Sequence, residues 1–245
     1  MTNQVITGRG VNLVCGTSVF GEIQNVSEVM ETISKIDTSS HNNVSSVKTS
    51  RPGFSENSEL SVDLGFTGGA EQTAIRTQYR AGTVSTWMIV APCASITMAW
   101  SFQGYVSACS TPTFDKDGNS KMSFKVQPTG VISEISTAVV TGLTALAVTD
   151  QGSTALALDP TPFAATTYGY KITTDLNDTG VKVTATDASA NETIYINNVS
   201  ATSGAATDAI TIPTAAGQVL MIPVVIFKTS CVPKIYWIEV THGYV

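Results

Sequence analysis

Charged side chains are scarce in this chain. Only 13% of its 245 residues are Asp, Glu, Lys or Arg, roughly half of the share in an average soluble domain. Disordered chains combine high charge with low hydrophobicity, and a hydrophobic share of 42% excludes that class. We expect a surface that is neutral and polar, or that is buried against other copies of the chain. The 13 basic and 19 acidic residues give a net charge of −6. This charge argues against a protein that binds nucleic acids through their phosphates.

The residue types used for catalysis and metal binding are also few. The chain has two histidines and four widely spaced cysteines, with no Cys-x-x-Cys pair, so we expect free thiols in a reducing compartment and no zinc site. The pair Asp115 and Asp117 lies in a turn-like stretch that lacks the other ligands of a calcium loop. Neither a Gly-x-Ser-x-Gly motif nor a phosphate-binding loop is present. The sequence therefore predicts no enzyme, no metal and no cofactor.

Long apolar runs are missing as well. No stretch approaches the roughly 18 apolar residues of a membrane-spanning helix. The first residues lack the apolar core, roughly 7–15 residues long, of an export signal. We therefore expect neither a membrane span nor Sec-dependent export.

The length suits one large β domain or two ordinary ones. A change to small apolar residues after position 136 places the expected boundary between domains 1–137 and 138–245. Within the first domain we expect an extended arm at 1–20, a long polar loop at 37–58 and one helix at about 68–81. A loop of that length is uncommon in a compact domain and usually has a task, such as contacting a partner.

One helix stands out among patterns that favour strands. Glu71 in its first turn and Arg80 near its end match the helix dipole, and Gly82 occupies the position of a C-terminal cap. We expect its apolar stripe to consist of Ala74, Ile75, Gln78 and Tyr79. The segment 22–37 fits either a helix or strands, because apolar residues recur at helical spacing among β-branched ones.

The remaining patterns alternate with the period of a strand. The stretch 59–66 places Leu60, Val62 and Leu64 on one face and Glu59, Ser61 and Asp63 on the other. Short alternating runs separated by Gly, Asp, Asn and Pro in the second half suit a small antiparallel sandwich. The other expected strands are 86–91, 96–107, 121–127, 143–148, 155–158, 167–173, 180–186, 193–196, 209–212, 219–227 and 235–241.

Three stretches of the first domain carry a resemblance to a known family. They are Arg51-Pro-Gly-Phe54 followed by the strand Glu59–Leu64, the helix Gln72–Gly82 leading to Thr86–Val90, and Ser101–Val106 followed by Lys121–Val126 and Gly130. In their order and spacing, residues 1–137 resemble the major tail tube proteins of siphophages, the phages with long non-contractile tails. The resemblance implies a β-sandwich or barrel with one flanking α-helix.

The second domain resembles a bacterial Ig-like or cadherin-like β-sandwich. The stretches that carry this likeness are Leu158–Phe163, Tyr168–Ile172, Val181–Ala185, Tyr195–Asn197 and Ile235–Thr241. Lys228–Pro233 departs from the charged hairpin that is usual in such modules. Together the two resemblances imply a mainly β chain with a tail tube domain followed by an Ig-like sandwich.

The tail tube resemblance implies a structural virion protein. Its subunits would form stacked rings, expected to be hexameric, around a lumen through which phage DNA passes into the host without specific binding. The expected partners are other copies of the chain and the tail tip, tape measure and tail terminator proteins. Assembly would take place in the host cytoplasm, and the Ig-like domain would project outward, with weak contact to host-surface glycans as one expected role.

Two groups of residues are the candidates for these roles. Glu59, Ser61 and Asp63 are expected to line the lumen, where neutral or acidic groups would not hold DNA phosphates. An ordinary solvated sheet face explains the same row equally well. Arg51, Pro52 and Phe54 are expected to contact the next ring.

Other protein classes remain open at this point. A surface adhesin or carbohydrate-binding protein made of two β-sandwiches is the main alternative, although the missing export signal counts against it. A pilus-like or capsid-decorating protein would share the assembly but not the lumen.

Overall fold

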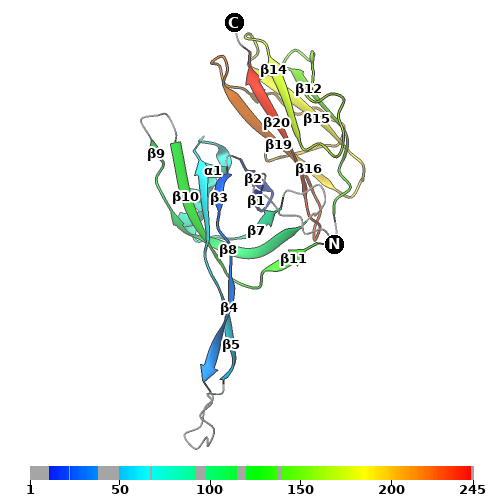
Figure 1. Ribbon diagram of the computed structural model, residues 1–245. Helices are drawn as coiled ribbons and strands as arrows, with labels where there is room; N and C mark the ends of the chain where they lie inside the picture. The colour runs from blue at the N-terminus through cyan, green and yellow to red at the C-terminus, as the bar shows by residue number, and fades with distance from the viewer. Residues whose placement is uncertain are drawn as a thin grey trace, which may run out of the picture. The chain divides into compact units, whose positions relative to one another are not determined.

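The computed structural model describes residues 11–21, 23–37, 50–66, 68–91, 98–114, 120–136 and 139–243. It is mainly β, as the sequence predicts, and its described part contains one helix (Figure 1). No helix among these residues is long and apolar enough to cross a membrane.

The largest sheet has nine strands. Its order is β2-β1-β7-β8-β10-β6-β3, with β11 beside β8 and β9 beside β10. The strands are β1 (Asn12–Cys15), β2 (Ser18–Phe20), β3 (Ile23–Val26), β6 (Leu60–Gly65), β7 (Val84–Val90), β8 (Ala99–Cys109), β9 (Thr113–Phe114), β10 (Ser120–Pro128) and β11 (Ser133–Ile135).

The chain divides into two compact units. One contains Met1–Gly21, Met88–Ser101 and Glu134–Val245, and the other contains Glu22–Trp87 and Phe102–Ser133. We call them the sandwich unit and the hairpin unit. The division differs from a single boundary near residue 137, because the N-terminal strands belong to the same unit as the C-terminal half.

The expected extended arm is wrong for its described part. Residues 12–20 form the hairpin β1–β2, with Leu13 paired to Phe20 and Val14 to Val19. Both strands are buried, and Leu13 has no exposed surface. Gly16 supplies the turn with φ of 61°, which glycine adopts without steric cost. The short length of the strands hid their pattern. Residues 1–10 lie outside the described part.

The expected loop at 37–58 is also corrected, and the ambiguous segment before it is β rather than helical. The strand β3 belongs to the nine-stranded sheet. The strands β4 (Glu31–Asp37) and β5 (Ser50–Asn57) form a separate two-stranded hairpin. It extends away from the other strands of the hairpin unit (Figure 1). Most of its described side chains are exposed, so neither strand needs the apolar alternation that marks a half-buried strand. Residues 38–49 lie outside the described part.

The helix α1 (Ala70–Ala81) agrees with the expected position. Gly82 caps it in the left-handed conformation, as the sequence predicts. The predicted stripe is only partly right, because Ala74 and Tyr79 are exposed and the buried residues are Gln72 and Ile75.

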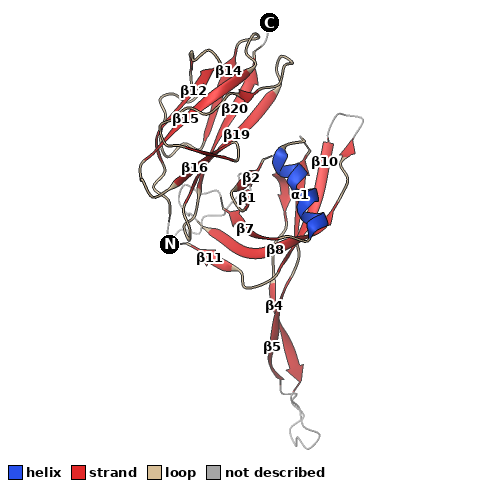
Figure 2. Ribbon diagram, turned by 180° about the vertical axis from the view of Figure 1, so that it is seen from behind, coloured by secondary structure: helices blue, strands red, loops and turns tan. Residues whose placement is uncertain are grey.

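Gln72 joins the start of the helix to the strand before it. Its side-chain amide donates to the Gly65 carbonyl oxygen at 2.9 Å and accepts from the Gly68 amide at 3.2 Å. Because Gln is polar, an apolar stripe could not reveal this buried position. Figure 2 shows α1 against one face of the sheet.

The core of the hairpin unit follows the predicted alternation. β6 and β10 pair antiparallel with Leu64 opposite Met122 and Val62 opposite Phe124. All four side chains are buried. Trp87 on β7 is fully buried, and its indole donates to the Gly104 carbonyl oxygen at 3.2 Å. The large aromatic ring therefore packs in the core while its N–H finds a hydrogen-bond partner.

The C-terminal half is a sandwich of two sheets. One sheet has the order β13-β12-β15-β18 and the other β14-β20-β19-β16-β17. Their inner faces form one apolar core, which includes Val183, Ile196, Ile222 and Ile238. The strands are β12 (Leu143–Asp150), β13 (Ala155–Leu156), β14 (Gly169–Thr174), β15 (Gly180–Asp187), β16 (Thr193–Ile196), β17 (Val199–Ala201), β18 (Ile210–Thr211), β19 (Val219–Phe227) and β20 (Lys234–His242).

A second apolar cluster lies on the outer face of the five-stranded sheet. Val225, Val232 and Ile235 of the sandwich pack there with buried side chains of β1, β2, β7 and β8, which are Val14, Val19, Met88, Val90 and Ala99. The sandwich unit therefore has three layers, and its N-terminal strands are an integral part of it. We call this cluster the third-layer contact.

Candidate assembly surface

One face of the sheet in the hairpin unit is polar. Lys121, Ser123 and Lys125 on β10 are exposed and alternate with buried apolar residues. Ser61 and Asp63 of β6 and Ser107 of β8 are half-buried on the same face. Helix α1 covers the opposite face, because Ile75 is buried with the apolar side chains.

The three predicted lumen residues lie together on this polar face. Glu59 precedes β6, and its carboxylate accepts from the Ser107 hydroxyl at 2.7 Å and from Lys125 Nζ at 3.1 Å. The Ser107 hydrogen bond, followed by the Lys125 hydrogen bond, lowers the pKa of the Glu59 carboxyl. Asp63 accepts from the Ser123 hydroxyl at 2.6 Å. The row is therefore held in place by its neighbours.

The charge of this face is balanced. Lys125 pairs with Ser61 and bonds to Glu59, and Lys121 pairs with Gly65, two positions along β6 from Asp63. Two acidic and two basic groups give no net charge, and hydroxyl groups occupy the positions between them. The face is therefore neutral and polar, whereas the acidic row alone would predict a negative one.

The hairpin β4–β5 exposes apolar side chains. Met30, just before β4, is 50% exposed, and Ile33 and Ile36 on β4 are 62% and 37% exposed. An isolated two-stranded ribbon is marginally stable in water. These apolar groups therefore suit a surface that another protein covers. Their 3-residue spacing is visible in the sequence. It did not identify an exposed apolar surface, because the same spacing fits a helix as well as a strand.

The predicted inter-ring residues fall on β5 of this hairpin. Arg51 is exposed and pairs with Ile36, and Pro52 pairs with Lys35. The backbone of Phe54 belongs to β5, while its side chain lies outside the described part. Glycine is favoured at position 53, because a Cβ there would lie only 3.0 Å from the carbonyl oxygen of Ser34.

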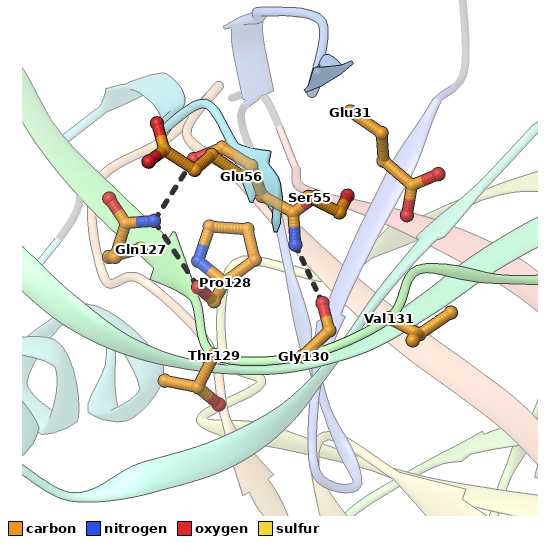
Figure 3. A pocket seen from close by; sticks show the side chains of 9 residues that line it. Glu31, Ser55, Glu56, Gln127, Pro128, Thr129, Gly130 and Val131 are labelled. Atoms are coloured by element: carbon orange, nitrogen blue, oxygen red, sulfur yellow. Dashed lines mark hydrogen bonds between the residues drawn. The ribbon is translucent and has the colours of Figure 1, made fainter. Parts of the chain in front are cut away.

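A hollow of about 580 Å³ lies where the hairpin leaves the sheet (Figure 3). Its walls include Glu31, Glu56 and Val131. Asn57 Nδ2 donates to the Gly130 carbonyl oxygen at 2.6 Å, and Gln127 Nε2 donates to the Asn57 carbonyl oxygen at 3.1 Å. These bonds fix the base of the hairpin to the end of β10 and to the segment after it.

The described residues include no group of three or more His, Cys, Asp or Glu that could hold a metal ion. His242 is buried beside the Thr174 hydroxyl, and His41 lies outside the described part. Asp178 accepts from the Asp175 amide at 2.8 Å in the turn between β14 and β15. Asp115 and Asp117 lie outside the described part.

Comparison with known families covers the C-terminal half. Residues 143–242 match the family model of a cadherin-like beta sandwich domain. This confirms the sandwich that the sequence predicted there. No curated protein matches the chain.

Several solved structures resemble part of the chain. A chain of the anti-feeding prophage baseplate is 9% identical, with 56% of this chain and 98% of that chain covered and a TM-score of 0.47. A chain of the sheath/tube terminator of the PVC extracellular contractile injection system is 13% identical (55% and 99% covered, TM-score 0.46). A chain of the SPP1 tail tube is 16% identical (53% and 78% covered, TM-score 0.43).

Proposed function

We propose that the chain is a structural subunit of a phage tail tube. Copies form rings, expected to contain six subunits, and the rings stack into a hollow tube that conducts DNA. The observation that carries the proposal is the hairpin β4–β5, which exposes apolar side chains on a ribbon with few contacts of its own.

The hairpin is the proposed contact between rings. Met30, Ile33 and Ile36 would be buried against the neighbouring ring, together with Arg51, Pro52 and Phe54. Burial of an apolar side chain contributes about 1.5–3 kcal/mol when it is complete, so a few such residues per subunit support a polymer of many copies. Because the hairpin and its acceptor are different surfaces, stacking is head-to-tail and produces an open filament.

The polar sheet face is the proposed lumen lining. Glu59, Ser61 and Asp63 lie on it, Lys125 bonds to Glu59, and the face carries as many lysines as carboxylates. A lining without net positive charge binds DNA phosphates weakly, because phosphate contacts dominate protein–DNA affinity. DNA would therefore pass without specific binding.

The remaining assignments follow from this role. The chain would act without catalysis, in the phage particle, after assembly in the host cytoplasm. Its partners would be its own copies and the tail tip, tape measure and tail terminator proteins. The cadherin-like sandwich would face outward from the tube.

Electron microscopy of the purified chain tests the proposal. We expect hollow tubes of stacked rings, and we expect Ile33→Ser to abolish or shorten them because it removes an exposed apolar contact. Val84→Ser is the matched control, since Val84 is also exposed (52%) but lies outside the hairpin. Tubes that persist in Ile33→Ser and disappear in Val84→Ser would contradict the role of the hairpin.

A second outcome bears on the whole proposal. Monodisperse monomers at high concentration, even with a tail-tip initiator added, would argue against a tube subunit. Binding in a glycan screen under the same conditions would then favour the adhesin alternative.

A further inference from the structure

The turn between β16 and β17 consists of Asn197 and Asn198. Ile196 pairs with Val199, so the loop has two residues, and both have positive φ, at 50° and 65°. Positive φ at both central positions is the mark of a type I′ turn, in which asparagine is favoured. The turn therefore projects the Asn198 side chain from the end of a tight hairpin.

The Asn198 carboxamide pairs with the backbone of strand β2. Its Oδ1 accepts from the Val19 amide at 2.8 Å, and its Nδ2 donates to the Val19 carbonyl oxygen over a longer 3.5 Å. β2 is at the edge of its sheet, with β1 as its sheet neighbour. The side-chain amide thus takes the place that a peptide group of an additional strand would take.

Two further contacts hold the same strands. The Trp237 indole on β20 donates to Asn12 Oδ1 at 3.0 Å, and a Cβ on Gly21 would lie 3.7 Å from the same ring. The third-layer contact buries Val14 and Val19 against the outer face of the sandwich. The hairpin β1–β2 is therefore covered on its apolar face and capped at its edge by one partner.

We propose that the cadherin-like sandwich is a built-in partner for the hairpin β1–β2, and that Asn198 closes the β2 edge against strand addition by another chain. Exposed strand edges are templates for pairing with other chains. The subunit would therefore need the sandwich to prevent association through the β2 edge, and removal of the sandwich would expose that edge. This inference goes beyond the proposed tube function and does not depend on it.

Two single substitutions in the full-length chain test it. Asn198→Gly removes the carboxamide and keeps the positive φ, and the resulting Asn-Gly sequence is favoured in a type I′ turn, so the sandwich is expected to stay folded. Asn197→Gly is the matched control, because it changes the same turn and leaves both bonds to Val19 in place.

The readout is hydrogen exchange of the Val19 amide, followed by NMR on the monomeric protein. We expect about tenfold faster exchange in Asn198→Gly than in Asn197→Gly, the change that follows from loss of one hydrogen bond. We also expect larger species on size-exclusion chromatography for Asn198→Gly only. Equal Val19 exchange rates in the two variants would overturn the proposal, whether or not either variant forms tubes.

Discussion

Truncation of Val14 measures how firmly the N-terminal hairpin is packed on the sandwich. Val14 is 1% exposed and belongs to the third-layer contact. Val14→Ala removes two methyl groups, worth about 1.6 kcal/mol of transfer free energy at about 0.8 kcal/mol each. The cavity left behind adds to this value, so we expect a total loss of about 2–3 kcal/mol.

The loss is large enough to measure by heat denaturation. At roughly 2–4 °C per kcal/mol for a chain of this size, the transition of the sandwich unit should fall by about 4–12 °C. Circular dichroism during heating, or calorimetry, records it. Val199→Ala is the control, because Val199 is 67% exposed and surface changes usually stay within about 0.5 kcal/mol. Equal melting temperatures for the two variants would refute the packing of β1 and support a loose arm.

Three further predictions concern single residues. Gly104→Ala should lower the free energy of unfolding by about 1–3 kcal/mol, because the new Cβ would lie 2.9 Å from a backbone carbonyl oxygen of β10. Urea denaturation measures this loss. Gly130→Ala is the control and should change little, because a Cβ there meets no atom within 4 Å. Gln72→Leu should cost about 1–3 kcal/mol in the same assay, because it removes the two hydrogen bonds to the backbone of Gly65 and Gly68. No loss would mean that these hydrogen bonds contribute nothing. Burial raises the pKa of the Asp187 carboxyl, and the charge of Glu192 adds to the shift. The protonated carboxyl therefore contributes stability that is complete below the pKa of an aspartate in the unfolded chain. This contribution is lost as pH rises through the pKa of Asp187 in the folded protein. Asp187→Asn should remove this loss, and identical pH profiles of melting temperature for wild type and variant would contradict the assignment.

The strands of the sandwich could be predicted because their physics is local. Apolar side chains alternate wherever one sheet face is buried, and turn residues separate the runs. The strands 193–196 and 219–227 were predicted with the bounds that the structure has. The strand β17 was missed, because its three residues are too short to show a period.

The hairpin β4–β5 could not be predicted for the opposite reason. Its two strands pair with each other and bury little, so the sequence shows no apolar alternation. Pro52 and Gly53 are residue types typical of turns, yet both lie inside β5. Proline is tolerated in an edge strand, where its missing amide hydrogen costs no sheet hydrogen bond.

The candidate surface was predicted in part. Alternation placed Glu59, Ser61 and Asp63 on one face, and the structure agrees with that grouping. The balancing effect of Lys125 could not be foreseen, because it depends on which strand lies beside β6. The bonds of Asn198 and Trp237 to the N-terminal strands were equally invisible, since they join residues far apart in sequence.

The position of β20 has a consequence for biosynthesis. β20 lies between β14 and β19, and Trp237 on it bonds to Asn12, 225 residues earlier. A nascent chain that has not reached β20 can complete neither the five-stranded sheet nor the cover over β1–β2. Contacts of such long sequence separation form slowly, and exposed edges invite association in the meantime. The strands β1 and β2 leave the ribosome long before β20 and must wait for it, which makes this interval the point at which a chaperone would be most useful.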